Sequence, residues 1–526
     1  MNFTTEERRK IARLLPDMRR RQILIGMGAA AAIGAIGLPG GLRAATTGTL
    51  TVAANANPSS LDPATGGSGS DHVFLFNFYD TLIDWTPDTL EPVPGLARAF
   101  TFTDPKTLVL DLQEGVTFHD GTPLDAEAVK LNLDRSREAQ VSNIRADLET
   151  VESVEVTGPL QVTLHLKEPD SALPLILSDR AGMMISPKAL SEAEGGRVDR
   201  APVGAGPWKF TGWTDGERVA GEAYSGYWRQ GAPGVAKIEL LVVPEPTTRL
   251  RAVQSGQAQI CYQLSERQIP IIKRTPNLTL METPTLYIYN IYLNAGRGPL
   301  QDPRVRQALS LAIDRDAFLL ATQAGVGEAA YGFLPKTHWA YSAEPQTLNA
   351  HDPDRAAALM KEAGVSGLEL DFRGYPDQAS VQRQEVIMSQ LARIGVKGRF
   401  TNAPIAESSG RFFGPEKIGD ALLSAWTGRP DPSMSYDLVF SQNSYFNTGK
   451  VAAPDGFDAA IAASRATADQ AERKAALATA QKLGAESAIS IPLTVRYEVD
   501  AYAEGVENFT ANLLGKPKFN AVTRVG

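Results

Sequence analysis

The chain has 526 residues, 43% of them hydrophobic and 21% charged, so it is long enough for two or three domains that each bury a full core. Its single cysteine, Cys261, excludes an internal disulfide framework and any CxxC metal or redox site. The formal net charge of −8, with no basic tract to offset it, argues against nucleic acid or anionic lipid as a partner.

The first 44 residues are predicted to be an export signal. Three arginines at 19–21 precede an uncharged apolar run, and small residues follow Arg43, an order typical of a signal peptide. The RRQIL core resembles a twin-arginine signal, which directs folded proteins out of the bacterial cytoplasm. We expect cleavage near Ala44 and a periplasmic mature protein. A retained anchor is the alternative, because residues 22–42 are long enough to span a bilayer.

The mature chain is expected to be an acidic monomer. Residues 1–44 hold eight Lys/Arg and three Asp/Glu, so the other 44 basic and 57 acidic residues carry a net charge of −13. Basic residues that gather at one place in such an acidic chain would therefore indicate a candidate functional site.

Strands and helices alternate along the mature chain. Segments 107–113 and 162–168 alternate apolar and polar residues as strands do, and 124–136 between them is predicted as a helix capped by Asp125. This alternation predicts open α/β layers with parallel strands. The later predicted elements are a strand at 236–244, a helix at 247–256, a tyrosine-rich strand at 285–294, a helix with the apolar stripe Val305, Ala308, Leu309, Ala312 and Ile313, a strand at 368–374, a helix at 380–395, and strands at 396–402 and 419–426.

Two loops follow predicted strands and carry arginine beside an aromatic residue. FRGYPD contains Arg373 and Tyr375, and WTGRPDP contains Trp426 and Arg429. Ligands of open α/β sheets bind beyond the carboxyl ends of strands. Arginine grips carboxylates at two points and stacks on aromatic rings, so both loops are candidate ligand contacts. The alternatives are a structural Arg373 and an Arg429 that pairs with Asp431 in a rigid turn.

Other motifs indicate no enzyme. The five histidines have no metal-ligand spacing, and His119 in FHDG is interpreted as the end of a strand before a turn. No serine or cysteine nucleophile is recognisable, so no catalytic residue, metal site or cofactor is predicted. The loop GGSGS runs into a helix near Asp71, so its N–H groups, with Ser70 and His72, are candidates to meet an anionic ligand group. A solvated loop is the alternative.

The stretch LVLDLQEGVTFHDGTPLDAEAVKLNLDRS resembles the signature of the family 5 extracytoplasmic solute-binding proteins of peptide and nickel ABC transporters. Four further stretches agree in order and spacing, and the likeness covers about residues 48–520: VGAGPWKFTGW, YWRQGAPGVAKIELLVV, DPRVRQALSLAIDR and DPDRAAALMKEAG.

The resemblance implies a two-lobed α/β periplasmic-binding-protein fold of type II with an extra inserted subdomain. Ligand would bind between the lobes, which close on it and deliver it to an ABC permease with its ATPase subunits. The hinges would lie near Tyr289, also a candidate ligand contact, and Val499. The implied boundaries are lobe I at 45–285 with the insertion at about 96–203, lobe II at 286–498, and a return to lobe I at 499–526.

The resemblance also implies residue roles. Arg373 and Tyr375 match an R-x-Y loop whose arginine binds the peptide carboxylate in dipeptide-binding members. Those members carry an aspartate for the α-ammonium three residues after the tryptophan, where this chain has Arg429. Either Asp431 takes over the amine, or the ligand carries two acidic groups, as an opine, a γ-linked peptide or a carboxylate-rich metal chelate does. The leading interpretation is a peptide or peptide-like anion; a metal–metallophore complex is the alternative, and an exported hydrolase a distant one.

Overall fold

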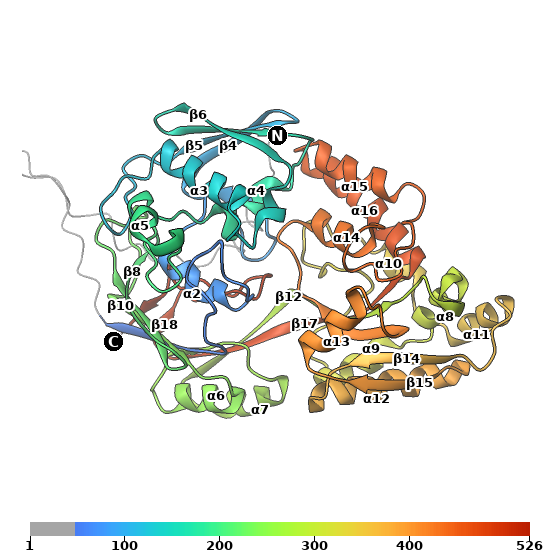
Figure 1. Ribbon diagram of the computed structural model, residues 1–526. Coiled ribbons are helices and arrows are strands. Elements are labelled where there is room, and N and C mark those ends of the chain that lie inside the picture. The colour runs from blue at the N-terminus through green and yellow to red at the C-terminus, as the bar shows by residue number, and fades with distance from the viewer. Residues whose placement is uncertain (1–47, 526) are drawn as a thin grey trace, which may run out of the picture. The chain divides into compact units, whose positions relative to one another are not determined.

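The computed structural model describes residues 48–525, and the predicted signal lies outside them. Two long antiparallel strands, β12 (Leu278–Leu293) and β17 (Ser490–Ala503), run through both halves of this region (Figure 1). They belong to one mixed 11-stranded sheet in the order β15-β14-β16-β12-β17-β11-β1-β10-β9-β8, with β13 beside β17. We call the half built on β1 and β8–β11 the first lobe, and the half built on β14–β16 the second lobe.

The first lobe is centred on β1, which pairs in parallel with β10 and β11. Its strands are β1 (Thr49–Ala54), β8 (Trp208–Thr214), β9 (Arg218–Ala223), β10 (Lys237–Val242) and β11 (Ile260–Cys261), with the two-stranded pairs β2 (Ile83–Trp85) with β3 (Pro92–Pro94) and β18 (Val506–Glu507) with β19 (Thr523–Arg524). Its helices are α2 (Asp71–Phe78), α6 (Pro246–Gln254), η4 (Glu266–Gln268) and α7 (Ile269–Arg274).

A subdomain with its own hydrophobic core lies within the first-lobe sequence. Its antiparallel sheet has the order β4-β5-β7-β6. The predicted helix α3 is confirmed, and Asp125 caps it by accepting the Ala128 N–H at 2.9 Å. The elements are β4 (Ala97–Asp104), β5 (Thr107–Leu112), α3 (Ala126–Glu138), η1 (Arg145–Leu148), β6 (Val151–Gly158), β7 (Gln161–Leu166), α4 (Leu173–Ile176), η2 (Arg180–Gly182), α5 (Pro187–Glu192) and η3 (Glu194–Gly196).

The second lobe is centred on β14, which pairs in parallel with β15 and β16. The apolar stripe predicted around α8 is buried in its core, as expected. The elements are η5 (Gly298–Gln301), α8 (Pro303–Leu311), α9 (Arg315–Gln323), β13 (Glu328–Ala329), α10 (Glu344–Leu348), α11 (Pro353–Glu362), β14 (Glu369–Gly374), α12 (Gln378–Leu391), η6 (Ala392–Ile394), β15 (Lys397–Asn402), α13 (Ile405–Phe413), β16 (Ala421–Trp426), α14 (Pro432–Phe440), α15 (Phe457–Ala466) and α16 (Gln470–Ser487).

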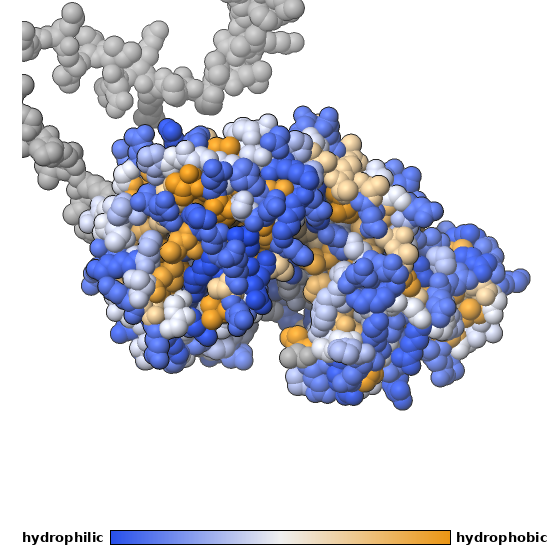
Figure 2. Space-filling view, turned by 45° about the horizontal axis from the view of Figure 1, so that its top comes forward, coloured by the Kyte–Doolittle hydropathy of each residue, from blue (hydrophilic) through white to orange (hydrophobic). Residues whose placement is uncertain are grey.

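Parallel pairing is limited to the centres of the lobes, although the sequence predicted parallel strands generally. β12 and β17 are antiparallel because they cross between the lobes in opposite directions. Their register shifts between Pro284 and Ile288, which interrupts the ladder where the strands leave the first lobe. Figure 2 shows a hollow between the lobes with hydrophilic surface along its first-lobe side. The loops after β14 and β16 belong to the second lobe.

Candidate functional site

The loop after β16 carries Trp426 and Arg429. Trp426 is buried among aromatic rings and donates its indole N–H to Ser435 Oγ at 3.1 Å. The Arg429 guanidinium carbon lies 5.0 Å from the centre of the Trp426 ring, and Nη1 donates to the Gly428 carbonyl at 2.7 Å. Within residues 48–525, Arg429 forms no ion pair, so its charge is available to a ligand.

Gly428 fixes this loop against β12. Its φ of +76° lies in the left-handed region, and an added Cβ would lie 2.3 Å from Leu286 Cβ. Leu286 is itself held, since its N–H donates to the Leu513 carbonyl at 2.7 Å. Arg429 therefore follows a backbone position that is set by its contact with β12.

Asp431 is held inside the second lobe. It caps α14, where Oδ1 accepts the N–H of Ser433 at 2.9 Å and its hydroxyl at 2.6 Å, while Oδ2 accepts Arg473 Nη2 at 2.6 Å. Burial alone would raise the pKa of Asp431, but Arg473 and Ser433 together lower it. The carboxylate is fully buried and both oxygens are engaged. Its partner is Arg473, so the Arg429–Asp431 pair considered from the sequence is not formed.

Arg373 and Tyr375 lie at the end of β14, as the sequence predicted. Arg373 is buried, and its Nε has no hydrogen-bond partner in the described part of the chain. The Tyr375 hydroxyl lies 2.6 Å from Ser424 Oγ on β16 and 3.1 Å from Ser409 Oγ on α13. These contacts tie the end of β14 to the strand that leads to Trp426. An unpartnered buried guanidinium there fits an anion.

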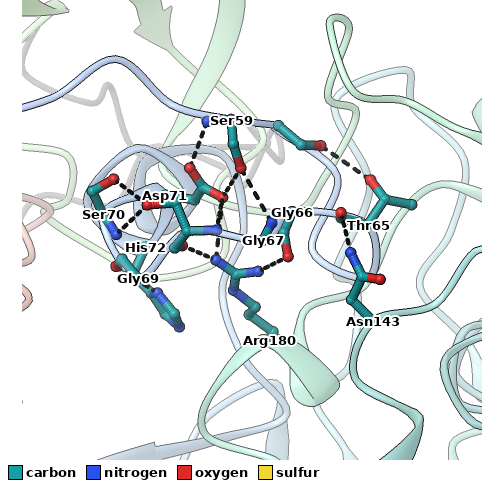
Figure 3. Close-up of polar contacts among 12 residues, drawn as sticks. Ser59, Thr65, Gly66, Gly67, Gly69, Ser70, Asp71, His72, Asn143 and Arg180 are labelled. Atoms are coloured by element: carbon teal, nitrogen blue, oxygen red, sulfur yellow. Dashed lines mark hydrogen bonds and ion pairs between the residues drawn. The ribbon is translucent and has the colours of Figure 1, made fainter. Parts of the chain in front are cut away.

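On the first lobe, the loop that contains GGSGS is ordered around Asp71 (Figure 3). The Asp71 carboxylate accepts the Ser59 N–H and hydroxyl, both at 2.6 Å, and pairs with Arg180 Nη2 at 3.3 Å. Arg180 also donates to the carbonyls of Gly66 and Ser68. The loop is therefore held from inside by a buried ion pair.

Ser70 and His72 follow at the start of α2. Ser70 Oγ bonds Ser68 Oγ at 2.7 Å, and His72 Nε2 lies 2.5 Å from Asp179 Oδ1. Lys516 Nζ reaches Asp179 Oδ2 at 3.3 Å. Burial lowers the pKa of His72, although Asp179 opposes the shift. Burial alone would raise the pKa of Asp179, but His72 and Lys516 hold this pKa well below its usual range.

Asp147 in η1 is a further acidic residue that the sequence analysis did not single out. Its pKa is raised to about 6 by burial and by Asp179, and Arg429 of the second lobe opposes the rise. Asp147, Asp179 and Lys516 come from segments far apart in the sequence. No local pattern marks any of them.

Tyr289 lies on the other face of the sheet from Trp426. Ile288 pairs with Trp426, so the next side chain points the opposite way. The Arg383 guanidinium carbon lies 4.3 Å from the centre of the Tyr289 ring, and both line a cavity of about 290 Å³ with Arg267 and Arg496. Tyr289 is therefore not brought together with Trp426 and Arg429.

His119 and Cys261, the other two residues considered from the sequence, are buried in the protein interior. His119 Nε2 bonds the Gly206 carbonyl at 3.0 Å, and burial lowers its pKa to about 4. Cys261 is buried, and burial raises its thiol pKa to about 12. Among residues 48–525, no group of three or more His, Cys, Asp or Glu side chains could hold a metal ion. Within the same residues, no helix is long and apolar enough to cross a membrane.

Comparison with known proteins identifies the family. The model of the bacterial extracellular solute-binding proteins, family 5, matches residues 91–447. The chain belongs to this family. A curated relative, the glutathione-binding protein GsiB of Salmonella paratyphi A (strain ATCC 9150 / SARB42), is 32% identical over 88% of this chain and 91% of its own length.

Solved structures of similar fold cover nearly the whole described region. HbpA2 from Haemophilus parasuis matches with a TM-score of 0.80 at 23% identity, over 91% of this chain and 100% of that one. A dipeptide binding protein from Pseudoalteromonas sp. SM9913, solved with Met-Leu, matches with a TM-score of 0.76 at 23% identity, over the same shares. The two-lobed type II binding-protein fold expected from the sequence is thus confirmed. The protein is the solute-binding component of an ABC importer, and its family consists of extracytoplasmic binding proteins.

Proposed function

We propose that this protein captures small peptide-like anions with at least two carboxylates, and that a γ-linked peptide such as glutathione is the type of ligand. The observation that carries the proposal is Arg429, a cation without an ion-pair partner in the described chain, stacked on Trp426. Dipeptide-binding members would have an aspartate at this position. A guanidinium repels an ammonium and attracts a second carboxylate. The name of the 32% identical relative, which spans nearly the whole protein, supports this class of ligand.

The site residues take distinct roles in this proposal. Arg429 binds one carboxylate and Trp426 forms an apolar wall, while Arg373 binds the other carboxylate and Tyr375 orients its loop. Ser70 and His72 contribute the first-lobe side. Asp431 supports the turn through its cap and its pair with Arg473. Tyr289 contributes to the hinge rather than to ligand contact.

The wider assignments are part of the same proposal. The protein is exported to the periplasm by a twin-arginine signal cleaved near Ala44, acts as a monomer without a cofactor, and binds ligand without altering it chemically. It delivers the ligand to a membrane permease. Lobe I comprises 45–285 with the insertion at about 96–203, lobe II comprises 286–498, and 499–526 returns to lobe I.

A thermal-shift panel on the purified protein tests the proposal. The probes are glutathione, oxidised glutathione, neutral dipeptides and nickel–histidine complexes. A ligand at 100 times its dissociation constant adds about 2.7 kcal/mol to the free energy of unfolding. We expect the glutathione compounds to raise the melting temperature and neutral dipeptides to leave it unchanged. A response confined to neutral dipeptides, or to the nickel complex, would overturn the proposal, as would hydrolysis of a probe.

A further inference from the structure

Asp147 of the inserted subdomain is a carboxylate without a side-chain partner in the described part of the chain. It is half-buried in η1, and within residues 48–525 it takes part in no side-chain hydrogen bond or ion pair. Burial raises its pKa to about 6; Asp179 adds to the rise, and Arg429, Arg180 and Lys516 oppose it. A carboxylate that is partly removed from water and has no protein partner loses hydration that nothing in the protein replaces, so its position fits a role toward a bound group.

Three of the four charged groups that act on the pKa of Asp147, namely Asp179, Arg180 and Lys516, are engaged with other partners. Arg180 pairs with Asp71 and donates to loop carbonyls. Lys516 is bound to Asp179, and the two Asp179 oxygens are taken by His72 and Lys516. Of the four charged groups that act on the pKa of Asp147, Arg429 alone has no ion-pair partner within residues 48–525. Asp147 and Arg429 do not form an ion pair with each other, although Arg429 acts on the pKa of Asp147.

The packing of the lobes brings the surroundings of these two residues together. η1 packs beside α4, and Ser171, two residues before α4, contacts the second lobe. Its N–H donates to the Arg465 carbonyl and its hydroxyl to the Ser464 carbonyl, both at 3.0 Å. Met434 of α14, which follows the Arg429 loop, packs against the core of the inserted subdomain. Asp147 and Arg429 therefore lie on opposing sides of one lobe interface.

We propose that Asp147 and Arg429 together hold a free α-amino-acid head group, with the ammonium on Asp147 and the carboxylate on Arg429. The inference rests on the proposed function and makes it more specific. In dipeptide-binding members the ammonium would be bound by an aspartate of the second lobe, at the position that Arg429 occupies here. In this protein the ammonium would instead be bound by Asp147 of the first lobe. One head group then touches both lobes, so binding it also favours closure.

This pairing distinguishes two kinds of peptide. In a γ-glutamyl peptide the ammonium and a carboxylate share one carbon, so one head group satisfies both Asp147 and Arg429. In an ordinary α-linked peptide the N-terminal ammonium has no carboxylate beside it, and Arg429 would stay unpaired and repel the amine. The ligand class is therefore compounds with a γ-glutamyl or equivalent α-amino-acid end and a second carboxylate.

Titration calorimetry with matched ligands tests the inference. The probes are γ-Glu-Cys-Gly, its α-linked isomer, and glutaryl-Cys-Gly, which lacks only the ammonium. Each is titrated into wild type, Asp147→Asn, and a control variant, Asp104→Asn, at the exposed end of β4. We expect wild type and the control to bind the γ-linked peptide at least 10-fold more tightly than glutaryl-Cys-Gly. Asp147→Asn should bind these two ligands equally.

A pH series gives a second readout. Only ionised Asp147 attracts the ammonium, so wild-type affinity should fall as pH drops through about 6, whereas Asp147→Asn should not show this component. His72, paired with Asp179 nearby, titrates in both proteins and cancels in the comparison.

The outcomes separate the inference from the proposed function. If wild type binds both γ-linked and glutaryl peptides with equal affinity and Asp147→Asn changes neither, the role of Asp147 is refuted and an anion-binding site remains. If wild type binds none of the dicarboxylates, the proposed function itself fails. Preference for the α-linked isomer would also overturn the inference.

Discussion

Replacing Asp431 by asparagine should damage stability and leave ligand selectivity intact. The substitution keeps the shape of the side chain but removes the charge opposite Arg473, whose Nη2 lies 2.6 Å from Oδ2. Asp431 is fully buried and Arg473 is 6% exposed, so the guanidinium is left in the interior without a counter-ion. Breaking one side of a buried ion pair costs about 3–5 kcal/mol. Urea denaturation of wild type and variant measures this loss.

A matched control lies on the same helix. Asp437 pairs with Arg465 at 3.0 Å but is about one third exposed, so Asp437→Asn should cost about 1 kcal/mol or less. Burial alone would raise the pKa of Asp431, but Arg473 lowers it. Its stabilising contribution is therefore complete above the unfolded-state pKa and is lost only as pH falls through the lower folded-state pKa. A variant of unchanged stability that no longer distinguished amine-bearing from amine-free ligands would refute this reasoning.

Other substitutions test the loops and the signal. Arg429→Gln should weaken binding of a dicarboxylate by about 10-fold to 150-fold, because a charge-assisted hydrogen bond contributes about 1.5–3 kcal/mol; calorimetry on a variant of unchanged melting temperature checks this. Gly428→Ala should lower both stability and affinity, since the added Cβ would lie 2.3 Å from Leu286 Cβ at a φ of +76°; a well-folded variant with wild-type affinity would contradict that. Replacing Arg20 and Arg21 together by lysine should leave the precursor in the cytoplasm, which cell fractionation measures. Normal export of this double variant would refute the twin-arginine assignment.

Local pattern predicted the elements that depend on nearby residues. The cap at Asp125 and the apolar stripe from Val305 to Ile313 were visible because helix caps and stripes involve residues a few positions apart. The two arginine loops were predicted because they directly follow apolar strands. Their arrangement beyond the ends of β14 and β16 follows from parallel pairing.

Contacts between distant segments were beyond this reasoning. Asp431 pairs with Arg473 on α16, a choice that depends on how α14 and α16 pack. The effect of Arg429 on the pKa of Asp147 acts across the contact between the lobes, which joins Ser171 to the Ser464 carbonyl. Tyr289 faces away from Trp426 because of the β12–β16 register, which no single strand reveals. The positions of these side chains depend on strand register and helix packing, so they cannot be predicted until the fold is known.

The central claim is that the charge at position 429 selects the ligand, and charge reversal tests it most directly. Titration calorimetry would compare wild type with Arg429→Asp, using glutathione and a neutral dipeptide such as Met-Leu. The account predicts that wild type binds glutathione and not the dipeptide, and that Arg429→Asp loses glutathione and gains the dipeptide. Wild-type binding of the neutral dipeptide that the reversal leaves unchanged would contradict it.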